Sequence, residues 1–73
     1  MDDICRIVGK NVRAARLALR LSQEDLADKA EIDRTYVSGV ERGLRNPSIK
    51  VLARLAKALK TTPAALITAG QKF

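Results

Sequence analysis

The chain has no histidine, no tryptophan, a single cysteine and only two aromatic residues, Tyr36 and Phe73, among its 73 residues. Without histidine it lacks the side chain that most often serves as a base near neutral pH and as a metal ligand. Cys5 has no second cysteine with which to form a disulfide or a metal pair, so we expect an ordinary thiol in a reducing cytosol. With so few aromatics, the core must be built from Leu, Ile, Val and Ala.

Long apolar runs and glycine-rich loops are also missing. No stretch approaches the roughly 18 apolar residues of a membrane-spanning helix, and the amino terminus is acidic at once, unlike a signal peptide. No glycine-rich loop of the kind that holds phosphates is present, and helix capping and solvation account for the acids near residues 23–30. We therefore expect a cytoplasmic, non-enzymatic protein with no catalytic residue, metal, cofactor, membrane contact or small-molecule ligand.

The charge is strongly asymmetric along the chain. Fourteen Lys and Arg against eight Asp and Glu give a net charge of +6 and a pI near 10.1. All eight acids lie at or before Glu41, whereas residues 42–73 carry seven basic residues and no acid. This asymmetry favours an acidic partner, of which nucleic acid is the obvious one, although a basic chain of this size can also simply be soluble.

Apolar periodicity and capping residues predict short helices and no strand. Apolar residues recur at steps of three or four, starting at Ile4 in the first helix and at Ile49 in the fourth. The N-cap candidates are Ser22, Asp33, Ser48 and Thr62. The predicted helices cover about 2–20 or 3–20, 23–30, 34–42, 49–59 and 63–69. We therefore predict a single all-α domain over residues 1–73.

The predicted helix 34–42 has two different faces. At about 100° per residue, one arc of about 140° holds Arg34, Thr35, Ser38, Arg42 and, at its margin, Gly39. Val37 and Val40 point the other way, and Tyr36 falls on the flank. Arg, Ser and Thr can read base edges, and a glycine lets a helix come close to another surface. The alternative is an ordinary solvated face with a tolerated glycine.

Three linked segments carry a family resemblance. LSQEDLADKA, DRTYVSGVERG and RNPSIKVLARLAKAL together resemble the helix-turn-helix family of phage Cro and repressor proteins, also called XRE-type regulators. The resemblance covers about residues 9–67 and implies a compact five-helix, Cro/phage-repressor-like domain of bacterial or phage origin. It implies a homodimer on a palindromic operator in double-stranded DNA. DRTYVSGVERGLRNPSI looks especially like the small controller proteins of restriction–modification systems.

The resemblance implies a role for most polar residues of the central region. The base-reading residues in the major groove would be Arg34, Thr35, Ser38 and Gly39. The phosphate contacts would be made by Gln23, Tyr36, Arg42, Arg45, Asn46 and Lys50. Gln23 would also buttress the reading helix, and Arg45 would be able to enter the minor groove. Arg16 and Glu41 would form a structural ion pair between the first and third helices.

Three positions depart from the family pattern. Glu31 stands where the turn often has glycine and would have to accept a left-handed conformation or an altered turn, at a cost of about 1–2 kcal/mol. Lys60 replaces a glycine after the fourth helix. Ala64 and Ala65 replace a common acidic pair, which leaves the sequence PAALI apolar.

The apolar last helix is the expected dimer interface, through Ala65, Leu66 and Ile67 together with part of the fourth helix. The alternative is that these residues only complete the core of the monomer. The alternatives for function are an antitoxin-type or other protein-interaction module on the same fold, or a phage-type repressor.

Overall fold

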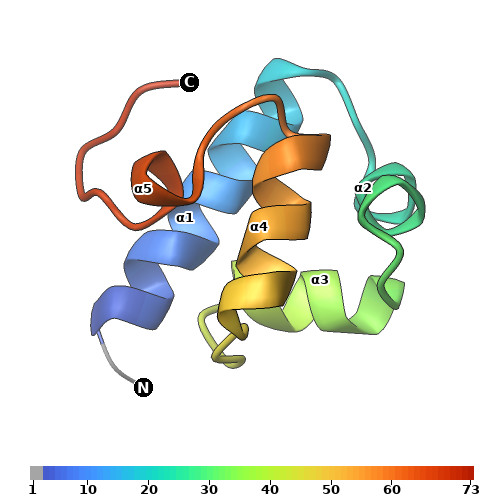
Figure 1. The fold of residues 1–73 in the computed structure, drawn as a ribbon, viewed down its shortest axis with the longest axis horizontal. Helices are drawn as coiled ribbons and strands as arrows, with labels where there is room; N and C mark the ends of the chain where they lie inside the picture. Colours follow the sequence, from blue (N-terminus) through green and yellow to red (C-terminus); the bar gives the residue numbers. More distant parts are fainter. Residues whose placement is uncertain (1–2) are drawn as a thin grey trace.

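Five α-helices are present in the computed structural model, which describes residues 3–73 (Figure 1). They are α1 (Asp3–Ala18), α2 (Gln23–Ala30), α3 (Arg34–Glu41), α4 (Ile49–Ala58) and α5 (Pro63–Leu66). Residues 3–73 contain no strand, so the all-α prediction is confirmed. None of the helices in this part of the chain is long and apolar enough to cross a membrane.

Side-chain caps start four of the helices, as predicted. Ser22, Asp33, Ser48 and Thr62 each accept a hydrogen bond from a backbone N–H of the first turn, at 2.8–3.2 Å. Ser22 takes part in a reciprocal pair, because its own N–H donates to the Asp25 carboxylate at 3.0 Å. Such capping satisfies donors that the first turn of a helix leaves without partners. Local chemistry thus explains where these helices begin.

The ends of the helices follow the prediction less well. The first helix stops at Ala18 rather than Arg20, because Arg20 has a left-handed φ of 58°. Its possible start at Asp2 lies outside the described residues. The last helix has four residues, Pro63–Leu66, and not the predicted 63–69. Around this end, Asn11 donates to the carbonyls of Ala65 and Leu66 in α5 and of Thr68 after it, as described below.

The turn between α2 and α3 has the strained geometry expected for a non-glycine residue. Glu31 adopts φ 58° and ψ 45°, and its N–H donates to Asp28 O at 3.3 Å. The next N–H, of Ile32, donates to Ala27 O at 3.0 Å. Lys60, after α4, is also left-handed with φ 57°. Glu31 and Lys60, the two residues that stand in place of glycine, therefore both adopt the left-handed conformation.

All five helices contribute side chains to the core, with α2 and α5 on opposite sides of α4 (Figure 1). Its largest fully buried side chains are Val12, Leu26, Val37, Val40, Leu55 and Leu66. Gly9 lets α1 approach α3 closely, because a Cβ atom there would lie 2.5 Å from Val40 O. Ile4 and Ile49, predicted to belong to apolar stripes, are instead 46% and 84% exposed.

Candidate nucleic-acid interface

The third helix presents a polar face and buries an apolar one. Its outward side chains are Arg34, Thr35, Ser38 and Arg42, here called the α3 face; Ser38 is half-buried and the others are exposed. On the opposite side Val37 and Val40 are fully buried. The arrangement agrees with the faces predicted from the helical angle. The α3 face therefore consists of donors and acceptors held on a helix whose other side is anchored in the core.

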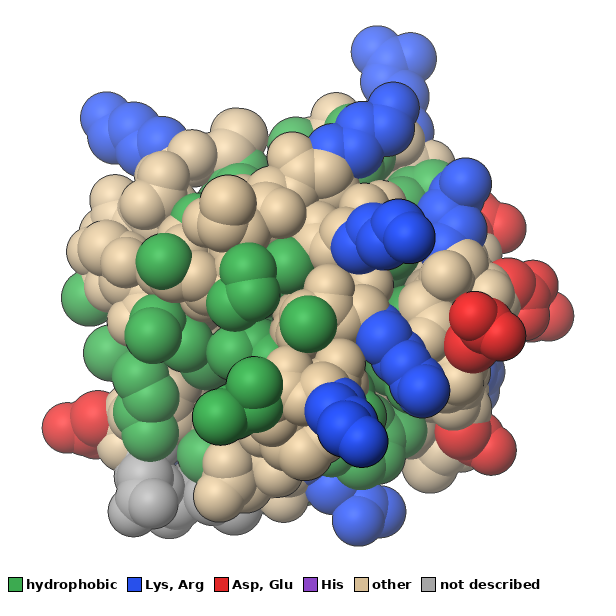
Figure 2. Space-filling model, viewed as in Figure 1, with side chains coloured by type: hydrophobic (Ala, Val, Ile, Leu, Met, Phe, Trp, Pro, Cys, Tyr) green, Lys and Arg blue, Asp and Glu red, His purple; other side chains and the backbone are tan. Residues whose placement is uncertain are grey.

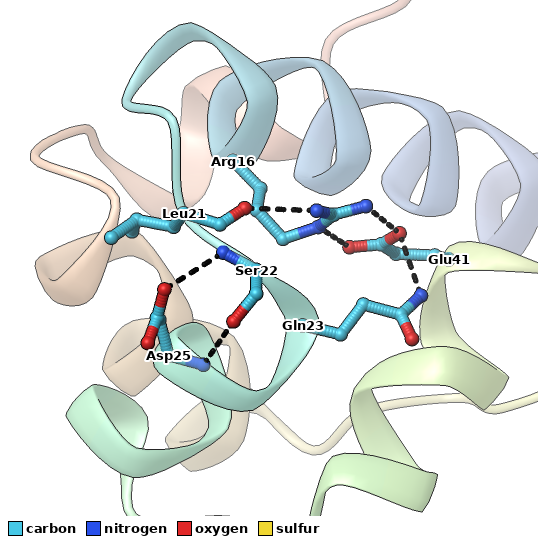
Figure 3. A network of polar contacts seen from close by, with 6 residues as sticks. All are labelled: Arg16, Leu21, Ser22, Gln23, Asp25 and Glu41. Atoms are coloured by element: carbon cyan, nitrogen blue, oxygen red, sulfur yellow. Dashed lines mark hydrogen bonds and ion pairs between the residues drawn. The ribbon is translucent and has the colours of Figure 1, made fainter.

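A buried ion pair fixes α3 to α1 and α2 (Figure 3). Arg16 Nε donates to Glu41 Oε2 at 2.7 Å, and Arg16 Nη2 donates to Glu41 Oε1 at 3.0 Å. Arg16 Nη1 donates to Leu21 O at 2.9 Å. The hydrogen bonds to Glu41 outweigh partial burial and raise the pKa of the Arg16 guanidinium above its ordinary value. The predicted pair is present in a bidentate form, which adds geometric specificity to its strength.

Gln23 adds a third group to this network. Its Nε2 donates to Glu41 Oε1 at 3.2 Å, so the first residue of α2 is bonded to the last residue of α3 (Figure 3). The predicted buttressing role of Gln23 has this contact as its basis. The side chain remains half-buried at the N-terminus of α2, where backbone N–H groups and the helix dipole favour an anion.

Gly39 has a different neighbour from the one predicted. The glycine is buried, and a Cβ atom there would lie 2.7 Å from Arg45 Cγ. The loop after α3 reaches this position because Gly43 is left-handed, with φ 74°, and Leu44 N donates to Gly39 O at 2.9 Å. Gly39 therefore makes room for Arg45, and its place among the base-reading residues stays a prediction.

Arg45 is also held by an aromatic ring. Its guanidinium carbon lies 5.6 Å from the centroid of the Tyr36 ring, within the range of a cation–π contact. Tyr36 is half-buried on the flank of α3, as its angle predicted. The remaining predicted phosphate ligands, Asn46 before α4 and Lys50 in its first turn, are exposed. Most of the predicted polar groups therefore belong to α3, the loop after it and the first turn of α4.

A second surface is apolar. It includes Ile4 and Ile49, which were predicted on apolar stripes but are exposed. We call Ile4, Ile49, Leu52 and Ile67 the apolar patch. Figure 2 shows hydrophobic side chains gathered over the first half of α4, over α5 and over the start of α1. Ile4, Leu52 and Ile67 line a shallow groove of about 90 Å³ together with Pro47. An exposed cluster of this kind is typical of a contact with another molecule.

The residues predicted for the dimer interface differ in how much of each is exposed. Ile67 is 45% exposed and belongs to the apolar patch, and Ala65 is half-buried. Leu66 is fully buried among the core residues, so its predicted place in an interface is wrong. A helix of four residues has little stability of its own and needs such an anchor.

Asn11 is a buried polar residue that the prediction missed. It is 6% exposed, and its Nδ2 donates to Leu66 O and Thr68 O at 2.9 Å each and to Ala65 O at 3.3 Å. A signal was available in the sequence, because Asn11 lies three residues after Val8 on the apolar stripe.

Within residues 3–73 no group of three or more Cys, Asp or Glu side chains is placed to hold a metal ion.

Comparison with known proteins agrees with this geometry. The sequence profile of the helix-turn-helix family matches residues 12–66. The chain therefore belongs to the helix-turn-helix family of DNA-binding transcriptional regulators. Within this family, the chain is similar to control proteins of restriction–modification systems.

Three of these proteins illustrate the similarity. Control protein C.SmaI of Serratia marcescens is 46% identical over 66 residues, which span 90% of this chain and 79% of the relative. The crystal structure of the restriction–modification controller protein C.AhdI from Aeromonas hydrophila superimposes with a TM-score of 0.82 at 45% identity, covering 85% of this chain and 94% of that one. The controller protein C.Esp1396I, solved as a tetramer on its natural 35 base-pair operator, gives 0.82 at 36% identity, covering 90% and 87%.

Proposed function

We propose that this chain is a restriction–modification controller protein that binds a palindromic operator as a homodimer, with α3 in the major groove of each half-site. The observation that carries the proposal is the combination, on one small domain, of the braced α3 face and the separate apolar patch. Similarity to C.SmaI and C.AhdI supports the restriction–modification role. The protein would act in the cytoplasm, without enzymatic activity or a cofactor, by occupying DNA near a promoter.

Base reading is assigned to three side chains of the α3 face. Arg34 can donate two parallel hydrogen bonds to the O6 and N7 atoms of a guanine. Thr35 offers a hydroxyl and a methyl group, which suits a thymine methyl, and Ser38 can donate to or accept from several bases. All three lie in the first five residues of α3, the part of a recognition helix that normally contacts bases.

Phosphate binding is assigned to groups that surround the α3 face. They are Gln23, Tyr36, Arg42, Arg45, Asn46 and Lys50. Gln23 would act together with the backbone N–H groups at the start of α2. Tyr36 and Arg45 would act together, because their cation–π contact restricts the guanidinium before DNA arrives. Contacts of this kind set the position of the protein on the duplex and supply most of the affinity that does not depend on sequence.

Pairing of two copies is assigned to the apolar patch. A single recognition helix contacts only a few base pairs, so helix-turn-helix proteins commonly bind two half-sites one helical turn apart through a two-fold dimer. Ile4, Ile49 and Ile67 expose much of their apolar surface. Complete burial of a side chain of this size contributes about 1.5–3 kcal/mol, and a symmetric interface would bury each one twice.

Selection of binding sites from a pool of random duplexes tests the proposal. We expect enrichment of an inverted repeat whose half-site centres are about one helical turn, 10–10.5 base pairs, apart. A single unrepeated motif would contradict the homodimer, and no enrichment at all would contradict sequence-specific binding by α3.

A further inference from the structure

Asn11 is a polar side chain in the middle of an apolar surface. It lies on the inner side of α1, between the buried residues Val8, Val12 and Ala15, and only 6% of it is exposed. Burial of an amide is unfavourable unless its donors and acceptors find partners. A leucine would fill similar space without that requirement. The choice of asparagine therefore points to the groups that it bonds.

Those groups bracket one residue of the apolar patch. Asn11 Nδ2 donates to the carbonyls of Ala65 and Leu66 before Ile67 and to the carbonyl of Thr68 after it. Within residues 3–73, no other protein hydrogen bond to the Leu66 and Thr68 carbonyls is present. The direction of the chain through Ile67 is therefore held from α1, across a sequence distance of more than 50 residues.

The burial of Leu66 does not by itself fix the direction of the chain through Ile67. Leu66 anchors α5 through its side chain in the core, but α5 is a single turn and the chain after it has no regular structure. The N–H groups of Ile67 and Thr68 donate to carbonyls of α5, but these bonds leave the carbonyls of Leu66 and Thr68 without a partner. Asn11 bonds both of these carbonyls and so adds a restraint on each side of Ile67.

We propose that Asn11 is a positioning residue for the homodimer, which gives the main chain around Ile67 the conformation that a second copy recognises. The inference rests on the homodimer proposed above. Without Asn11, this segment would have to become ordered at the moment of association, and that ordering weakens binding. The monomer also depends on Asn11, because its bond to the Leu66 carbonyl is buried, whereas Ile67 and Thr68 on either side of the segment are exposed.

The variant Asn11→Leu tests this role, because it keeps the size of the side chain and removes both donors. Sedimentation equilibrium would give the dimer dissociation constant, and binding of a duplex with a single half-site would report on the α3 face. We expect the dissociation constant to rise about tenfold or more with half-site binding of the folded protein nearly unchanged, while the melting temperature of dilute protein falls because the buried Leu66 carbonyl loses its partner. Leu17→Ala, which truncates an exposed residue on another side of α1, is the matched control and should leave all three quantities unchanged.

Two outcomes would overturn the inference. One is a dissociation constant for folded Asn11→Leu equal to that of the wild type. The other is a loss of half-site binding by folded Asn11→Leu as large as the loss of dimerisation, which would show a purely structural role. If Asn11→Leu does not fold, Asn11→Ser, which keeps a shorter donor, takes its place in the same measurements. A wild-type chain that stays monomeric both free and on a full operator would contradict the proposed homodimer instead.

Discussion

The carboxylate of Glu41 at the end of α3 receives two hydrogen bonds from the guanidinium of Arg16, at 2.7 and 3.0 Å, and the two side chains are only 4% and 10% exposed. Removal of one partner from a buried ion pair leaves the other charge without compensation. The pair therefore holds α3 at a defined angle to α1, and its loss should lower the stability of the whole fold.

Arg16→Met should test this brace. The substitution keeps most of the aliphatic stem and removes the charge, and we expect the free energy of unfolding to fall by about 3–5 kcal/mol, a large part of the stability of a small domain. Urea denaturation measures it. Arg13→Met, at an exposed position of the same helix, is the control and should change stability by no more than about 0.5 kcal/mol. A loss below about 1 kcal/mol for Arg16→Met would show that the pair is not a brace.

The cap of α2 should make stability depend on pH. The backbone N–H of Ser22 donates to the Asp25 carboxylate and lowers its pKa below the ordinary value of 3.8. Because the folded-state pKa is depressed, this contribution is complete above 3.8 and is lost as the pH falls through the folded-state value. The difference in melting temperature between wild type and Asp25→Asn should therefore be present at neutral pH and shrink below pH 3.8. A difference that stays constant down to pH 2 would contradict this account of the cap.

Gly39→Ala should separate folding from binding. Alanine is favoured over glycine by about 1 kcal/mol in a helix, but its Cβ would lie 2.7 Å from Arg45 Cγ and must displace that side chain. We expect weaker binding of every duplex without a comparable loss of stability, as measured by fluorescence anisotropy and thermal unfolding. In an Arg45→Ala background the glycine substitution should have no further effect on binding. An undiminished effect in that background would mean that Gly39 serves another contact.

Ile49→Glu should prevent pairing of the two copies. The side chain is 84% exposed in the monomer, so a carboxylate is tolerated there, but it would be buried without a partner in a dimer. We expect at least a hundredfold weaker dimerisation by sedimentation equilibrium and an unchanged circular dichroism spectrum. Leu17→Glu, at a residue that is 52% exposed outside the apolar patch, provides the matched change of charge. Equal effects of the two variants would exclude the apolar patch as the interface.

Features that depend on neighbouring residues in the chain could be predicted from the sequence. The caps at Ser22 and Asp33 and the two faces of α3 follow from local chemistry and from the helical repeat, whereas the special turn at Glu31 was indicated by the family resemblance. The Arg16–Glu41 pair is a long-range contact, and only the family resemblance indicated it.

Other features depend on packing that no local pattern encodes. Periodicity identifies apolar residues but does not show which neighbours cover them. The exposure of Ile49 and the burial of Leu66 could therefore not be predicted. The contact between Gly39 and Arg45 could not be predicted, because the return of the loop that brings Arg45 over the glycine is a tertiary contact. Asn11 bonds carbonyls at the end of α5 that are more than 50 residues away in the sequence.

The central claim is that α3 reads bases, and the most direct test is competition between the selected operator and a duplex altered in both half-sites. For Arg34→Ala we predict a loss of about 1–3 kcal/mol in operator binding, together with a lower ratio of operator affinity to altered-duplex affinity. For Arg45→Ala, which removes a phosphate contact, we predict weaker binding to both duplexes and an unchanged ratio. An Arg34→Ala protein that keeps the wild-type ratio would contradict the assignment of α3 as the reading helix.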